Sequence, residues 1–170
     1  FKIIDAEVMQ QGQMKSLKTS QEMNCSYNNF NNQKTDRKKY LEVLDQCIGI
    51  SKKPALVHVN AFQDLPTEEE IKLFNLKNLV SKNNLIEDQS EDVDGKLIVD
   101  FKGGKINVLF TTRCARGVDF PGDECRSIIF TKYPNPNIQD SFWKVLRETK
   151  PQFYWDFYKD KDRRELLQKI

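Results

Sequence analysis

Short apolar runs alternate with helical patterns along this chain. Residues 55–62, 106–111 and 127–131 are rich in Val, Ile, Leu and Phe and lack clean alternation. Such runs are typical of strands that are covered on both faces of a parallel sheet. Segments with helical spacing separate them. The pattern therefore predicts an α/β fold with three layers and a mainly parallel sheet.

The first predicted helices carry start signals. One helix begins at about Asp36, an N-cap residue, and ends before Pro54. Its apolar residues recur at Tyr40, Leu41, Leu44, Cys47 and Ile48. Pro66 and Thr67 open a second helix, and the acidic run at 68–70 favours the positive end of the helix dipole. We interpret that run as structural rather than metal-binding.

The later helical patterns complete the predicted layers. Ser90 or Asp92 opens a helix that closes at Gly103. Its apolar face contains Val93, Leu97, Ile98 and Phe101. Two more helices cover residues 139–149 and the segment from Pro151 onward. We expect their aromatic residues, Trp143 and Trp155 included, to pack within the protein.

The remaining segments are predicted from weaker patterns. Residues 1–9 and an apolar segment within 76–86 predict two further strands. Residues 15–36 are rich in Asn, Gln, Ser and Lys, a composition that cannot bury a core, so we expect a polar loop. We predict one domain spanning residues 1–170.

Composition excludes several classes of protein. At 38% hydrophobic and 31% charged residues, the chain is predicted to be globular and soluble. It contains no apolar run near the roughly 18 residues that span a bilayer, and no signal peptide. The four cysteines fit no zinc or iron–sulfur spacing, so we expect no metal site and free thiols in a reducing cytoplasm. We interpret His58, in the middle of a strand, as a core residue.

The polar loop at residues 111–122 has the makings of a site. It gathers hydroxyls, two arginines, a glycine and an aspartate just past a strand's carboxyl end. Ligands bind at that edge in open α/β sheets. A structural alternative is that Gly117 makes a turn, Asp119 caps it and the arginines are solvated.

The loop and its flanking strands carry a resemblance to a known family. RGVDFPG, preceded by VLFTT and followed by SIIFTKYPNP, resembles motif V and the next strand of superfamily 2 helicases of the XPD/DinG type, most closely the archaeal members. FKGGK before VLF has the family's order. The resemblance covers residues 1–170 and is strongest over 89–140. It implies the C-terminal RecA-like domain of an ATP-dependent DNA helicase.

The resemblance also implies roles for individual residues. Gly117 and Asp119 would face the nucleotide, Gln168 would begin the phosphate-binding motif VI, and Arg116 would serve either the nucleotide or the nucleic acid. Ala61 and Phe62 stand where the family has a hydroxyl residue and a tyrosine. The implied contacts to single-stranded DNA are made by Thr111, Thr112, Arg113, Asn60, Phe62 and Lys132. Because the net charge is only +2, such contacts need a local basic surface.

Cofactors and partners follow from the same resemblance. No GxxxxGK[ST] motif occurs, because a valine stands at position 99 ahead of Gly104-Lys105, so no P-loop is predicted. ATP and Mg would be bound mainly by an N-terminal RecA-like domain of the same protein, and this chain alone would bind neither. We expect this chain to be a monomer. Leu97 to Asp100 could pass for a Walker B strand, but its spacing is helical.

Two other classes remain as alternatives. One is a nucleic-acid-binding α/β module without motor activity, and the other is a small nucleotide-binding protein that acts alone. The lack of a P-loop argues against the second. Both ends of the sequence fall inside predicted elements, so we expect a piece of a longer protein. That expectation argues against a freestanding module.

Overall fold

The computed structural model describes residues 23–25, 27–113, 118–132 and 138–169, with the side chains of the last helix described as far as Lys161. The chain forms two compact units, residues 1–35 and 36–170, and each is described by itself. The strand predicted at residues 1–9 lies outside the described residues. The single domain over residues 1–170 stays a prediction.

The described part of the first unit contains a short helix, α2 (Tyr27–Asn31). The Asn24 carbonyl oxygen accepts hydrogen bonds from Asn29 Nδ2 at 3.2 Å and from Thr35 Oγ1 at 2.7 Å. Polar side chains that bond to nearby backbone stabilise compact local structure. The prediction of a polar loop over residues 15–36 is therefore wrong at α2.

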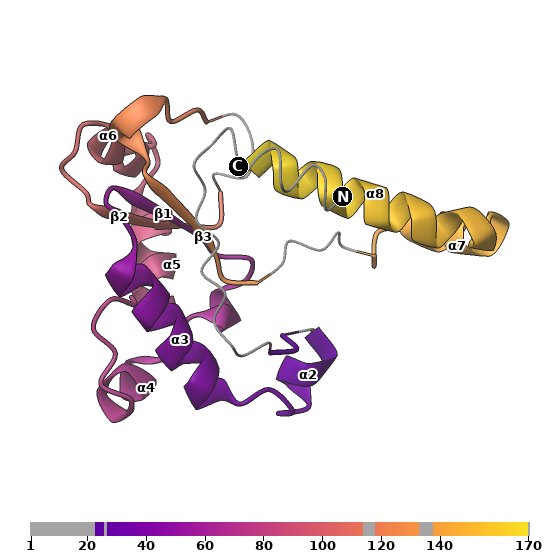
Figure 1. The fold of residues 1–170 in the computed structure, drawn as a ribbon, viewed down its shortest axis with the longest axis horizontal. Coiled ribbons are helices and arrows are strands. Elements are labelled where there is room, and N and C mark those ends of the chain that lie inside the picture. Colours follow the sequence, from indigo (N-terminus) through magenta and orange to yellow (C-terminus); the bar gives the residue numbers. More distant parts are fainter. Residues whose placement is uncertain (1–22, 26, 114–117, 133–137, 170) are drawn as a thin grey trace. The chain divides into compact units, whose positions relative to one another are not determined.

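A parallel three-stranded sheet is the centre of the second unit (Figure 1). Its strands are β1 (Ala55–His58), β2 (Val108–Thr111) and β3 (Ser127–Phe130), in the order β2-β1-β3. In the register, Leu56 of β1 lies opposite Leu109 and Ile128. All four residues of β1 are buried, as expected for a central strand. The predicted α/β class, the parallel sheet and these three strands are confirmed.

Helix α3 (Arg37–Ile50) begins as the sequence predicts. The Asp36 side chain caps it by accepting from Lys39 N. Its buried face contains Tyr40, Leu41, Leu44 and Ile48. Cys47, predicted to be buried, is half-buried, and this burial raises the pKa of its thiol.

A strand predicted within residues 76–86 is wrong. The segment instead runs as a loop into α5 (Lys82–Glu91), which Ser81 caps. The Asp45 carboxylate of α3 accepts from the backbone N–H groups of Lys77, Asn78 and Leu79 at 2.6–3.1 Å. In a strand, these backbone N–H groups would donate to a neighbouring strand. Here the Asp45 carboxylate accepts their hydrogen bonds instead, so the apolar segment is held as a loop.

Helix α6 (Lys96–Lys102) begins later than predicted, after Gly95. Ser90 lies inside α5, and Asp92 ends α5 while its carboxylate accepts from Leu97 N at 3.1 Å. Val93 precedes the helix and is exposed, so it does not belong to the buried face. The helical interpretation of residues 97–100 is confirmed.

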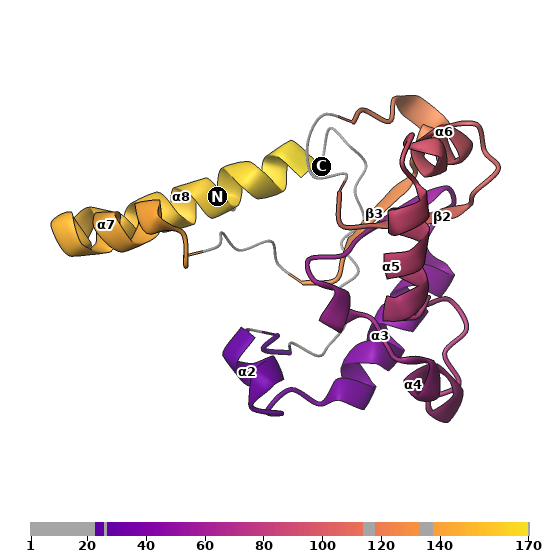
Figure 2. The same ribbon diagram turned by 180° about the vertical axis from the view of Figure 1, so that it is seen from behind.

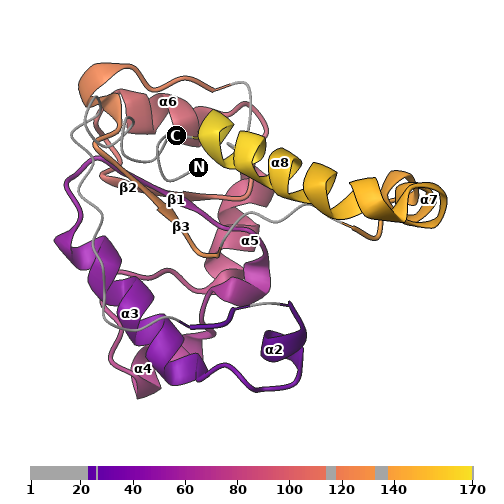
Figure 3. The same ribbon diagram turned by 45° about the vertical axis from the view of Figure 1, so that its right-hand side comes forward.

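The core beneath α6 joins helix, sheet and loop. Phe101 of α6 packs with Leu56 and Leu109, and half-buried residues surround them: Leu97, Ile98, Ile106, Val118, Phe120, Cys125 and Ile128. The Phe101 and Phe120 rings meet edge to face with centroids 5.4 Å apart. Figure 3 shows α6 on one side of the sheet and α3 on the other. This is the layered arrangement that the apolar runs predict.

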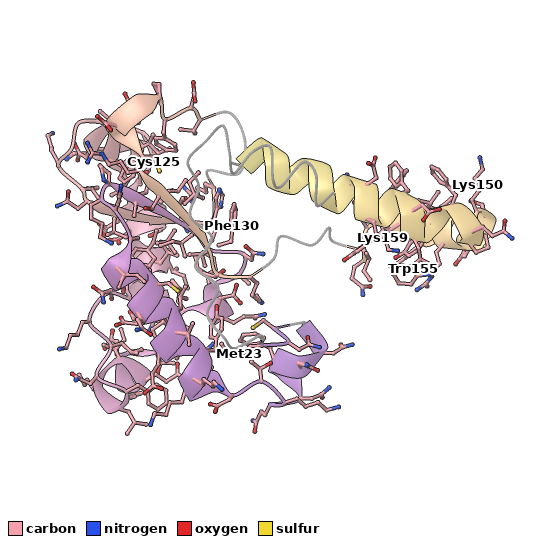
Figure 4. The ribbon with its side chains drawn as sticks, in the orientation of Figure 1. Met23, Cys125, Phe130, Lys150, Trp155 and Lys159 are labelled. Atoms are coloured by element: carbon pink, nitrogen blue, oxygen red, sulfur yellow. The ribbon has the colours of Figure 1, made fainter. Side chains whose placement is uncertain are left out.

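The last two helices, α7 (Ser141–Thr149) and α8 (Pro151–Lys169), pack against each other through aromatic rings. Trp143 is buried among Tyr154, Phe157 and Tyr158. Trp155 was predicted to pack as well, but it is 61% exposed on α8 (Figure 4). Its ring contacts Tyr154 and Tyr158 of the same helix, with centroids 5.0 and 6.0 Å apart, but it is not buried within the protein as expected.

Arg37 ties α3 to the 3₁₀ turn η1 (Phe62–Asp64) and to α4 (Glu68–Leu73). Its guanidinium donates to both Glu70 carboxylate oxygens at 3.0 and 3.1 Å and to the carbonyls of Gln63 and Leu65 at 2.8 Å. The Thr67 capping box adds a bond from its N–H to Glu70. The acidic run at the start of α4 therefore has a structural role, as predicted.

We expect Glu70→Gln to destabilise the fold in a pH-dependent way. Burial raises the pKa of the Glu70 carboxyl, but the bonds from Arg37 and Thr67 and the Arg37 charge outweigh it, so the pKa lies below its ordinary value of 4.5. A lowered pKa in the folded state adds stability above pH ~4.5 that is lost as the pH falls through the folded value. Urea unfolding should show a loss of about 1 kcal/mol at pH 7 that shrinks at lower pH.

Glu68→Gln is the matched control, since Glu68 is exposed in the same helical turn. It should leave the unfolding curve nearly unchanged at both pH values. An equal loss from both variants, or a Glu70→Gln loss that persists in acid, would contradict the assignment.

Candidate functional site

The carboxyl ends of the three parallel strands meet at one edge of the sheet. Backbone bonds extend the ladder past the strands, from Val59 N to the Thr111 carbonyl and from Thr131 N to the His58 carbonyl, each at 3.0 Å. We call this edge the strand-end edge. Its residues are Asn60, Ala61, Phe62, Asp64, Thr111, Thr112, Arg113, Thr131 and Lys132. Ligands of open α/β sheets bind at such an edge.

Asp64 is the buried centre of the strand-end edge. Its side chain is fully buried, and its Oδ2 accepts from Ala61 N at 3.1 Å and from Thr131 Oγ1 at 3.0 Å. Its Oδ1 lies 2.6 Å from Lys132 Nζ. Thr131 Oγ1 also accepts from Asn60 N at 3.1 Å. One carboxylate thus joins the chain that leaves β1 to the chain that leaves β3.

Lys132 has a different partner from the one the sequence predicts. Its side chain is only 12% exposed, and its ammonium forms the ion pair with Asp64. A cation held in a buried pair is costly to withdraw, because the partner charge would be left without compensation. The structure therefore places Lys132 in the framework of the edge rather than on its outer surface.

The chain after β1 presents side chains rather than backbone amides. The backbone N–H groups of Asn60 and Ala61 donate to Thr131 Oγ1 and to Asp64 Oδ2. Asn60 itself is exposed, and Phe62 is 36% exposed in η1. The predicted contact residues Asn60 and Phe62 thus lie on the surface of the edge.

Thr111, the last residue of β2, and Thr112 both turn their hydrogen-bond donors inward. Gln89, on the last turn of α5, accepts through Oε1 from Thr112 N at 2.9 Å, from Thr112 Oγ1 at 3.0 Å and from Thr111 Oγ1 at 3.4 Å. Gln89 and Thr111 are both buried. Figure 2 shows α5 beside β2, which is the placement that lets Gln89 reach the strand end. The hydroxyls predicted to face phosphate are therefore bonded to Gln89.

Arg113 is an exposed cation among the described residues of this loop. Its backbone N–H donates to Thr111 Oγ1 at 2.9 Å, while its side chain is exposed. Among the described residues its guanidinium forms no ion pair. An exposed guanidinium on an anchored backbone is suited to bind a phosphate group.

Asp119 lies further along the same loop, after residues 114–117. Val118 and Phe120 on either side of it are half-buried against the α6 core, and Asp119 is exposed. Within the described part of the chain its carboxylate has no hydrogen bond or ion pair, so no capping contact is seen for it there. The other predicted residues of this loop, Arg116 and Gly117, lie outside the described residues. Gln168 is in α8, and its side chain lies outside them as well.

Other candidate chemistry is absent from the described residues. No group of three or more His, Cys, Asp or Glu side chains in those ranges is placed to hold a metal ion. Cys47 and Cys125 are free thiols, and burial raises the pKa of both. His58 is buried in β1 and stacks on Phe130, as a core histidine does. No described helix is both long and apolar enough to cross a membrane.

Comparison with known protein families identifies the family of the chain. The model of the helicase C-terminal domain matches residues 44–170, which is most of the chain. The chain therefore belongs to the helicase C-terminal domain family, and its helices and parallel sheet are consistent with that domain. Comparisons with curated proteins and with solved structures gave no match.

Sequence reasoning missed Asp64 and Gln89. Asp64 follows a strand in an ordinary polar turn, and its partner Thr131 is 67 residues away. Gln89 lies on a charged helix 23 residues before Thr112. The feature that identifies both residues is the near-complete burial of a polar side chain. Burial is known only once the helices and strands are packed, so the sequence alone does not reveal it.

We expect Lys132→Met to cost about 3–5 kcal/mol of unfolding free energy, because it leaves the buried Asp64 carboxylate unpaired. Asp64→Asn combined with Lys132→Met should recover part of that loss. Chemical unfolding of the wild type, Lys132→Met and the double variant at pH 7 measures both effects. The matched control is Lys38→Met, whose exposed pair with Glu42 at 3.8 Å should contribute little. A loss no larger than that of Lys38→Met would contradict the role of Asp64.

Proposed function

We propose that this chain is the second motor domain of an ATP-dependent DNA helicase of the XPD/DinG type. It completes an ATP site between two RecA-like domains and contacts single-stranded DNA. The observation that carries the proposal is the loop after β2. The loop lies within the residues that match the helicase C-terminal domain family. It exposes Arg113 next to the sheet and Asp119 further along the chain.

The nucleic-acid side of the proposal rests on the strand-end edge. Arg113 supplies charge, and Asn60 and Phe62 are exposed at the neighbouring strand end. Phosphate contacts fix a nucleic acid without reading its bases, so binding is expected to be independent of sequence. The inward bonds of Thr111 and Thr112 and the ion pair of Lys132 give these residues a supporting role.

The nucleotide side rests on Asp119 with Gly117, Arg116 and Gln168. The exposed Asp119 carboxylate is suited to accept a hydrogen bond from a group of the partner domain at the shared ATP site. Arg116 would stabilise negative charge on the transferred phosphate. The described residues hold no glycine-rich phosphate cradle. Triphosphate and magnesium would therefore be held mainly by the N-terminal RecA-like domain, the partner domain in the same protein.

We expect Arg113→Ala to weaken binding of single-stranded DNA and to flatten its salt dependence. Each cation that neutralises a phosphate adds roughly 0.7 to the slope of log affinity against log salt on single strands. Titration of labelled poly-dT and of a mixed-sequence strand at several salt concentrations measures the slope. The loss should be equal on both strands.

Arg126→Ala provides the control for Arg113→Ala. It removes the same charge at the amino end of β3, where Arg126 pairs with Asp123 at 3.0 Å. This variant should keep the wild-type slope. Unchanged slope in Arg113→Ala, or a strong preference for one sequence, would exclude the proposed phosphate contact.

We expect Asp119→Ala to lower DNA-stimulated ATP hydrolysis by at least about tenfold when this chain is joined to its N-terminal motor domain. Thermal unfolding should hardly change, because the carboxylate is exposed. Asp123→Ala removes a second exposed carboxylate of the same segment and should retain activity. If Asp119→Ala keeps full activity, or if it unfolds the domain, the proposed role of Asp119 fails. The chain alone should not hydrolyse ATP.

A further inference from the structure

Three hydrogen-bond donors converge on one oxygen of Gln89. They are the Thr112 N–H, the Thr112 hydroxyl and the Thr111 hydroxyl, at 2.9, 3.0 and 3.4 Å from Oε1. A backbone N–H can only donate, so the carbonyl oxygen of the Gln89 amide has to face Thr112. The Gln89 side chain is 6% exposed, so water cannot easily replace it.

The contact continues from Gln89 to Arg113 through Thr111. The Thr111 hydroxyl gives its hydrogen to Gln89 and accepts the Arg113 N–H at 2.9 Å. Gln89 therefore holds the Thr111 side chain at the end of β2 and restrains the backbone of Thr112 directly and that of Arg113 through Thr111. The hydroxyls are used inside the protein, whereas the Arg113 guanidinium is exposed.

We propose that Gln89 is a positioning residue for single-stranded DNA. It anchors the end of β2 to α5, so the backbone that carries Arg113 is already fixed when a phosphate arrives. Fixing a loop before binding removes an ordering cost from the bound state. The inference rests on the proposed function, in which Arg113 contacts the DNA backbone.

A purely structural role for Gln89 makes a different prediction. If Gln89 only satisfied buried donors, its loss would lower stability and would affect DNA binding equally with or without Arg113. A positioning role acts through Arg113, so the effects of the two substitutions should not add. A double-mutant cycle separates these cases.

The test uses Gln89→Met, which keeps the side-chain length and removes the acceptor oxygen. Labelled poly-dT is titrated with the wild-type chain, Gln89→Met, Arg113→Ala and the double variant, at temperatures where thermal unfolding shows each to be folded. Gln89→Met should lower affinity by about threefold to tenfold, the scale of one hydrogen-bonded contact, with an unchanged salt slope. In the Arg113→Ala background it should cause little further loss.

Gln46→Met is the matched control, since Gln46 is exposed on α3, and it should bind like wild type. Thr111→Val is a second variant that breaks the contact to Arg113 and keeps the side-chain shape. It should give the same loss and the same lack of additivity, even if Gln89→Met fails to fold. Wild-type affinity in the folded Gln89 or Thr111 variant, or full additivity with Arg113→Ala, would overturn the positioning role. No effect of Arg113→Ala itself would instead refute the proposed DNA contact.

Discussion

The buried carboxylate of Asp64 is the contact on which the strand-end edge depends. A carboxylate without access to water has to be compensated by charge and hydrogen bonds, and Asp64 obtains both from the chain segments that follow β1 and β3. The requirement fixes the path of the chain after β1 and after β3. Tyr40 of α3 adds a bond from its hydroxyl to the Thr131 carbonyl at 3.0 Å. Helix and sheet are thereby held in one arrangement at this edge.

The same requirement explains which groups remain available for a ligand. The backbone amides of Asn60 and Ala61 and the hydroxyls of Thr111 and Thr112 are bonded inside the protein. What the edge exposes is a set of side chains, with Arg113 as its cation. In the proposed function such a surface would bind a phosphate backbone through few charges, in keeping with the small net charge of the chain. Asp119, exposed beyond the α6 core, is the residue that we propose for the nucleotide side.

Local chemistry explains what the sequence could predict. Apolar runs located β1, β2 and β3, and Asp36 and Thr67 marked helix starts because capping involves residues only three positions apart. The strand expected within 76–86 failed because Asp45, 33 residues earlier, holds that loop by its amides. The ion pair of Lys132 was not predictable, because its partner Asp64 is distant in the sequence. The chemistry of the loop after β2 was readable, whereas the contacts that hold it were not.

The most direct test of the account is whether DNA contacts the strand-end edge. Backbone amide and arginine Nε–Hε signals of the ¹⁵N-labelled chain can be followed by NMR during titration with an oligo-dT strand. The account predicts changes that saturate together at Asn60, Phe62 and Arg113, with the Arg113 side-chain signal among those that move. Changes confined to α7 and α8, with these signals unmoved at saturating DNA, would contradict it.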